Sequence, residues 1–194
     1  MEAISYDKND FEHLMLISQG HVAFQCLYTG LELGIFDLFS EKGPLNYQEI
    51  SEELRLNESS CKILIRALYS LNLLNKVNDK FTNSTIAISF LTNKSQLKFK
   101  DILGWQSKIV YPGIIDFTDA IKTNSNIGLR HFSGEGDNLY ERLSSNKELE
   151  MVFQKSMSAL SSSANQYFLQ HLDLKGINTL VDVGGGEGTN LKAI

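Results

Sequence analysis

Hydrophobic side chains recur at helical spacing along most of this chain, and the presence of only two prolines permits long helices. The first helical patterns cover residues 11–18 and 22–39, and Gly43-Pro44 ends the second of them. That second pattern is apolar around much of its circumference, as in helices buried on several sides. Further helices are expected over residues 85–91, 99–121 with a disturbance at 111–113, 139–143 and 149–168.

Residues 46–83 predict a helix–helix–hairpin unit. Asn46 is placed to cap a short helix over residues 47–54, with Glu49 at the capping-box distance, and Asn57 to cap a second helix over 58–73. Residues 74–83 then alternate around an Asn-Asp turn, which is the pattern of a β-hairpin. This order of elements is that of a winged helix, a module that either reads DNA or mediates packing and dimerisation.

Charge favours the second use of such a module. The net charge is −5, and the helix over 58–73 offers only Lys62 and Arg66 as basic residues. Nucleic-acid binding depends on neutralising phosphates, and a reading helix needs several donors aimed at the DNA. We therefore expect a dimerisation module and no nucleic acid, with a winged-helix transcription regulator as an alternative.

Composition places the chain among folded globular proteins, because 42% of its residues are hydrophobic. No run of about 18 apolar residues predicts a membrane span, and the acidic start lacks the build of a signal peptide, so a cytoplasmic location is expected. Cys26 and Cys61 have no CxxC spacing. They are expected to be reduced, buried thiols rather than a disulfide or a metal site.

A glycine-rich motif near residue 185 carries the chemistry of the chain. Residues 179–183 predict a buried parallel strand, and Gly184, Gly186 and Gly188 allow a tight turn that a ligand can approach closely. The dinucleotide fingerprint would need a third glycine where Thr189 stands. The shorter spacing, with Asp182 before the first glycine, favours S-adenosylmethionine over a nicotinamide cofactor, although a chance glycine-rich turn is the alternative.

The order and spacing of several segments give the chain a resemblance to the plant-type, caffeate-like O-methyltransferases and their bacterial small-molecule relatives. It covers nearly the whole chain and rests on residues 31–37, 66–74, Gly104-Trp105, 153–157 and 181–188.

This resemblance implies a mainly α-helical chain in three parts. A helical, winged-helix dimerisation domain covers 1–100, connecting and substrate-pocket helices cover 101–175, and 176–194 begin a Rossmann-like domain that is α/β in the complete enzyme. It also implies a homodimer in which S-adenosylmethionine gives its methyl group to a hydroxyl, usually phenolic, of a small aromatic substrate and leaves S-adenosylhomocysteine.

Individual residues match the family motifs. Gly184, Gly186, Gly188, Asp182 and Met157 match cofactor-binding positions, and Phe153, Met157 and Trp105 match positions that line the substrate side. The alternative for Phe153 and Met157 is a role in the helix core, because they are one helical turn apart. No metal is implied.

No catalytic residue is assigned within the chain. His13, His21, His131 and His171 all precede the glycine motif, whereas the family base and the ribose-binding acidic residue follow it, so surface or helix-capping roles are expected for these histidines. The apolar strand should need neighbouring strands, from a companion polypeptide or from residues beyond this sequence, and the chain alone should be inactive. A non-catalytic dimerisation protein and a nicotinamide oxidoreductase are further alternatives.

Overall fold

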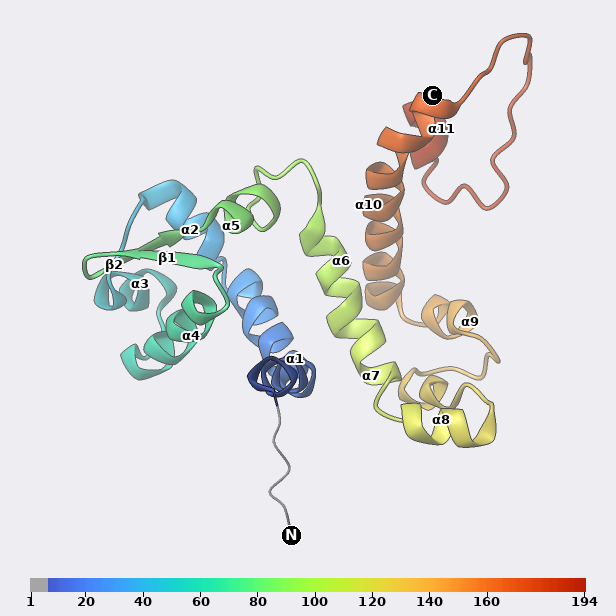
Figure 1. Ribbon diagram of the computed structural model, residues 1–194. Coiled ribbons are helices and arrows are strands. Elements are labelled where there is room, and N and C mark those ends of the chain that lie inside the picture. The colour runs from blue at the N-terminus through green and yellow to red at the C-terminus, as the bar shows by residue number, and fades with distance from the viewer. Residues whose placement is uncertain (1–6) are drawn as a thin grey trace. The chain divides into compact units, whose positions relative to one another are not determined.

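The computed structural model describes residues 7–194, apart from the side chain of residue 166, and the described chain is mostly helical (Figure 1). It forms two units that divide between Ser95 and Gln96. The first unit contains α1 (Lys8–Glu32), α2 (Ile35–Lys42), α3 (Tyr47–Leu54), α4 (Glu58–Ser70), β1 (Leu74–Val77), β2 (Lys80–Asn83) and α5 (Thr85–Phe90).

The first helices differ from the sequence prediction in where the break falls. The two expected patterns merge into the single helix α1, and the second pattern is interrupted before α2 begins. Gly34 causes this break, because its φ of 71° is left-handed and cannot continue a right-handed helix. The four apolar residues that follow it in α2 are buried in the core of this unit: Ile35, Phe36, Leu38 and Phe39.

The predicted caps of α3 and α4 are confirmed. Asn46 accepts a hydrogen bond from the backbone of Glu49, whose carboxylate accepts one from the backbone of Asn46. This backbone bond, with a second bond from Lys80, holds the pKa of Glu49 below its ordinary value. Asn57 caps α4, which ends at Ser70 rather than at residue 73 because Asn72 takes a left-handed φ of 57°.

The hairpin pairs β1 with β2 in antiparallel register, with Leu74 opposite Asn83 and Val77 opposite Lys80. Asn78 in the turn has a φ of 59°, a conformation that asparagine tolerates. Helix, helix and hairpin thus follow one another as predicted, while the winged-helix assignment itself stays a prediction. The core that joins the hairpin to the helices is made by Ile50, Cys61, Ile65, Leu68, Leu74 and Phe81.

The second unit is built around the long helix α10 (Lys147–His171), against which α6 (Phe99–Trp105) packs (Figure 1). The helix expected over 99–121 is broken after α7 (Tyr111–Gly113), where the disturbance was predicted, and it also contains a π-helical turn at Gln106–Val110 that was not predicted. The remaining elements are α8 (Phe117–Thr123), a 3₁₀ turn at Ile127–His131, α9 (Leu139–Ser144) and α11 (Thr189–Ala193).

A small hydrophobic cluster of Ile109, Phe132 and Leu143 holds these elements together. Two glycines permit the approach of the 3₁₀ turn to α7, since a Cβ on Gly128 would overlap the carbonyl oxygen of Gly113. The buried carboxylate of Asp116 lies beside this contact and accepts hydrogen bonds from Arg130 and from Nε2 of His131. Desolvation raises the pKa of Asp116, but these bonds outweigh it, so the pKa lies below its ordinary value.

The strand predicted over residues 179–183 is not formed, and this expectation is wrong for the chain as described. In the described residues the only paired strands are β1 and β2, and 172–182 have no helix or strand. Val181 and Val183 are 74% and 93% exposed. A parallel strand forms its hydrogen bonds with neighbouring strands, so without them the apolar sequence stays an extended connection between α10 and α11 (Figure 1).

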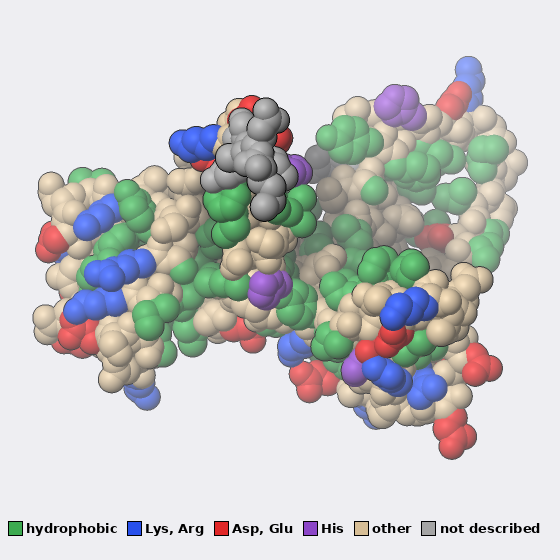
Figure 2. All heavy atoms as spheres, turned by 60° about the horizontal axis from the view of Figure 1, so that its bottom comes forward, with side chains coloured by type: hydrophobic (Ala, Val, Ile, Leu, Met, Phe, Trp, Pro, Cys, Tyr) green, Lys and Arg blue, Asp and Glu red, His purple; other side chains and the backbone are tan. Residues whose placement is uncertain are grey.

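Large hydrophobic side chains reach the surface in many places, and Figure 2 shows them on the face in view. Of the helices within residues 7–194, none is by itself long and apolar enough to cross a membrane. The pair α1 and α2, bent by 50°, reaches the length and apolar composition of a span only when both helices are counted together. Cys61 is buried, which raises its pKa, and Cys26 is half-buried. No group of three metal-ligating side chains occurs among residues 7–194.

Candidate cofactor and substrate pocket

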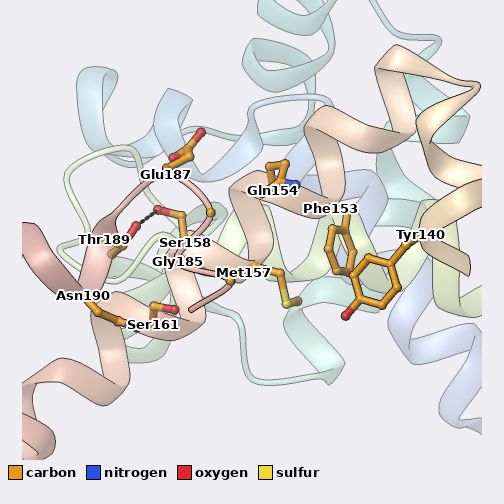
Figure 3. Close-up of a pocket in the computed structure, with 12 residues that line it drawn as sticks. Tyr140, Phe153, Gln154, Met157, Ser158, Ser161, Gly185, Glu187, Thr189 and Asn190 are labelled. Carbon is orange, nitrogen blue, oxygen red and sulfur yellow. Dashed lines mark hydrogen bonds between the residues drawn. The ribbon is translucent and has the colours of Figure 1, made fainter. Parts of the chain in front are cut away.

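A pocket of about 300 Å³ lies where α9 and α10 meet the glycine loop, residues 184–188 (Figure 3). It brings together four residues that the sequence analysis singled out, namely Phe153, Met157, Gly184 and Gly186. The other lining residues are Tyr140, Gln154, Ser158, Ser161, Gly185, Glu187, Thr189 and Asn190.

The glycine loop takes a conformation that requires its glycines. Gly184, Gly186 and Gly188 have φ angles of 74°, 54° and 72°, in the left-handed region that side chains with a Cβ rarely adopt. Gly185 is restricted by space instead, because its Cβ would lie 2.8 Å from the carboxylate of Asp182. The loop therefore turns tightly and leaves its backbone open to the pocket, as the spacing predicted.

Asp182 and Gly188 lie outside this lining. Asp182 borders a neighbouring pocket of about 350 Å³ with Leu180 and Val181, and this pocket shares Ser161 and Asn190 with the first. Its Oδ2 atom is buried without a hydrogen-bond partner. Buried carboxylate oxygens are normally satisfied, so this atom fits a site for a ligand that brings a donor. Gly188 instead closes the turn, its N–H donating to the carbonyl of Gly185 at 2.8 Å.

One end of the pocket is aromatic. Phe153 and Met157 project from successive turns of α10, and Tyr140 of α9 meets Phe153 edge to face, with ring centroids 5.4 Å apart and an angle of 86° (Figure 3). Such an edge-to-face pair is a favourable arrangement of aromatic rings. Tyr140 was not predicted from the sequence, because it lies on another helix and no local motif connects it to Phe153.

The other end is polar. Gln154, Ser158 and Ser161 of α10 face the loop, and Thr189 and Asn190 follow it. A Cβ at Gly186 would lie 3.6 Å from Oε1 of Gln154, which places this amide beside the loop. The spacing of Ser158 and Ser161 on one helical face is a sequence signal that could have indicated these residues.

Trp105 does not line the pocket. It packs with Phe153 against the cluster of Ile109, Phe132 and Leu143, and its Nε1 donor is buried without a hydrogen-bond partner. Phe153 therefore packs against the core and borders the pocket at once, and its role toward a substrate stays a prediction. A substrate role for Trp105 stays a prediction.

None of the four histidines lines the pocket. His131 stands at the surface as expected, and there it pairs with the buried Asp116. His21 and His171 bond to carbonyl oxygens of their own helices, those of Ser18 and Tyr167, and His171 lies in the last turn of α10. The arrangement can thus enclose a ligand with an apolar and a polar end, while no histidine in it is placed to remove a proton.

Two family models match successive parts of the chain. Residues 15–93 match the O-methyltransferase dimerisation domain, and residues 115–194 match the O-methyltransferase domain. The chain belongs to this O-methyltransferase family.

Individual relatives agree with the family. An L-tyrosine C(3)-methyltransferase of Streptomyces lavendulae is 36% identical over 95% of this chain and 50% of its own length. Acetylserotonin O-methyltransferase of Macaca mulatta is 24% identical over 90% of this chain and 52% of its own length. The chain thus spans about half the length of the curated relatives it matches.

Solved structures share the fold. The apo form of the S-adenosylmethionine-dependent methyltransferase SibL superposes with a TM-score of 0.82 at 33% identity, over 93% of this chain and 53% of that one. Human N-acetylserotonin methyltransferase, solved in complex with S-adenosylmethionine, has a TM-score of 0.86 at 23% identity, over 98% of this chain and 57% of the other.

Proposed function

We propose that this chain carries the glycine-loop part of the cofactor site, and the α10 wall of the substrate site, of an S-adenosylmethionine-dependent O-methyltransferase. The observation that supports this most directly is the pocket in which the glycine loop faces Phe153 and Met157 of α10. The motif and the helix are far apart in sequence, so their meeting is independent of the glycine spacing.

The residues of this chain fit such a cofactor. The left-handed glycines expose loop backbone, and the orphaned Oδ2 of Asp182 is an acceptor for a donor on the ligand, such as the amino group of the methionine moiety. When bound, S-adenosylmethionine supplies an electrophilic methyl group. Met157 lies between the loop and the rings of Phe153 and Tyr140, where it would contact both the cofactor and a flat acceptor beside it (Figure 3).

The acceptor that we propose is a phenolic hydroxyl of a small aromatic molecule. The rings of Phe153 and Tyr140 provide apolar, edge-and-face contacts for such a molecule. A ring carbon of a tyrosine-like phenol is a second candidate acceptor, because the relative at 36% identity is a tyrosine C(3)-methyltransferase. In both cases the phenol must lose a proton, and the base stays outside this chain in our proposal.

Methyl transfer distinguishes the two acceptors. A protein that contains this chain and a complete O-methyltransferase domain is incubated with methyl-labelled S-adenosylmethionine and either L-tyrosine or N-acetylserotonin. We expect label in a methoxy group, or in an aryl-methyl group if the second candidate holds, and nuclear magnetic resonance separates the two. The absence of labelled product with any phenol tested would contradict the proposal. The chain alone is expected to give no product.

The partner that we propose for the first unit is a second copy of the chain. The match to a dimerisation domain supports this, as does an apolar groove of about 360 Å³ between α1 and α4. Two lysines of the first unit give little support to the transcription-regulator alternative. Lys62 pairs with Glu58, and Lys80 pairs with Glu49. A light-scattering mass equal to that of one 21.8 kDa chain would contradict dimerisation.

We also propose that residues 179–183 become a strand only when further strands of an O-methyltransferase domain lie beside them. Their exposed valines support this, since an apolar strand is stable inside a sheet and not alone. A companion polypeptide is one source of such strands. Slow amide exchange at residues 179–183 themselves in the isolated chain would contradict this proposal.

A further inference from the structure

Thr189, the residue that follows the glycine loop, is bound to α10 at two points. Its hydroxyl lies 2.9 Å from the hydroxyl of Ser158 (Figure 3), and its carbonyl oxygen accepts a hydrogen bond of 3.4 Å from Nδ2 of Asn165. Ser158 and Asn165 are seven residues apart, about two helical turns, and so lie on one face of α10. Both the side chain and the backbone of Thr189 are therefore tied to the same helix face.

These bonds stand at the end of a connection that is otherwise held by local turns. Within residues 172–188, Ile177 donates to the carbonyl of Leu174 and Gly188 donates to that of Gly185. Val181 and Val183 project into solvent. Because such local bonds do not fix a segment relative to a distant helix, the position of the glycine loop over α10 depends on contacts at Thr189 and its neighbours.

The burial of Asn165 indicates that its bond matters. This amide is only 7% exposed, and a buried amide without a partner is costly. Small side chains on this face of α10, Ser158 and Ser161, leave room for the loop to approach the helix, and both border the pocket. The small residues thus provide the space, while Asn165 and Ser158 provide the bonds.

We propose that Ser158, Asn165 and Thr189 form a latch that fixes the glycine loop over α10 and thereby sets the affinity of the pocket for the cofactor. The three are positioning residues, since they act through the loop backbone. The cofactor part of this inference rests on the function proposed above, whereas the ordering of the loop does not.

The test compares Ser158→Ala and Thr189→Val with the control Ser162→Ala in the 194-residue chain. Ser162 is exposed on the same helix and its hydroxyl bonds to the carbonyl of Ser158, away from the loop. We expect both latch variants to speed amide exchange of residues 184–188 in the free chain and to weaken S-adenosylhomocysteine binding about two- to tenfold, as the loss of one hydrogen bond predicts. Thr189→Ser should restore both values.

The double variant gives the decisive comparison. If Ser158 and Thr189 act on each other, Ser158→Ala with Thr189→Val should be little worse than either single change. Latch variants that exchange and bind like Ser162→Ala would overturn the inference, as would full additivity of the two changes. If the unchanged chain does not bind S-adenosylhomocysteine, the proposed function fails for this chain, and loop exchange still decides whether the latch exists.

Discussion

Replacing Gly186 by valine is expected to weaken the binding of S-adenosylhomocysteine to this chain by about thirtyfold or more. Gly186 has a φ of 54°, where a β-branched residue costs about 2 kcal/mol, so the loop would leave the conformation that the pocket requires. The new side chain would also approach Oε1 of Gln154, which lies 3.6 Å from the position of its Cβ. Equilibrium binding, measured by calorimetry, reads out this change.

A matched control separates strain from loss of the site. Gly176 has a φ of 81° with no atom within 4 Å of its Cβ position, and it lies outside the pocket. Gly176→Val therefore introduces the same kind of backbone strain elsewhere in the same connection and should leave binding unchanged. Equal losses of affinity in both variants would show that the loop conformation at Gly186 has no special role.

Replacing Gly128 by alanine is expected to destabilise the second unit by about 3 kcal/mol or more. The added Cβ would overlap the carbonyl oxygen of Gly113 and lie 3.0 Å from its carbonyl carbon. A backbone group cannot rotate away as a flexible side chain can, so the 3₁₀ turn would have to separate from α7. Denaturant unfolding, followed by the fluorescence of Trp105, the single tryptophan, measures the loss in free energy of unfolding.

Gly104→Ala serves as the control for this prediction. Gly104 is inside α6, and no atom lies within 4 Å of its Cβ position. Alanine there should be neutral or should stabilise the helix by up to about 1 kcal/mol, because glycine has the lower helix propensity. If Gly128→Ala is as stable as Gly104→Ala, the close contact between Gly113 and Gly128 is not a feature of the folded protein.

Local signals in the sequence predicted local structure well. Asn46 with Glu49 marked a helix start because a cap needs only residues within one turn, and the hairpin after residue 74 followed from its turn and alternation. The glycines at 184, 186 and 188 were likewise predictable, since their left-handed φ angles follow from the chain's own geometry.

Features that depend on distant residues were not predictable in this way. The strand over 179–183 was expected from its apolar sequence, but a strand also requires partners, and residues 7–194 do not provide them. Tyr140 lines the site because α9 packs against α10, which no local motif reveals. The same holds for His131, whose partner Asp116 lies on the other side of α8 in the sequence.

The most direct test of the proposed function is a titration of the isotope-labelled chain with S-adenosylhomocysteine, followed by backbone amide nuclear magnetic resonance. Even weak binding to part of a site is visible by this method. We predict shifts concentrated in residues 184–188 and in α10 around Met157 and Ser158, which border one pocket. Shifts confined to the first unit, or no shifts at saturating ligand, would contradict the assignment of the glycine loop as a cofactor site.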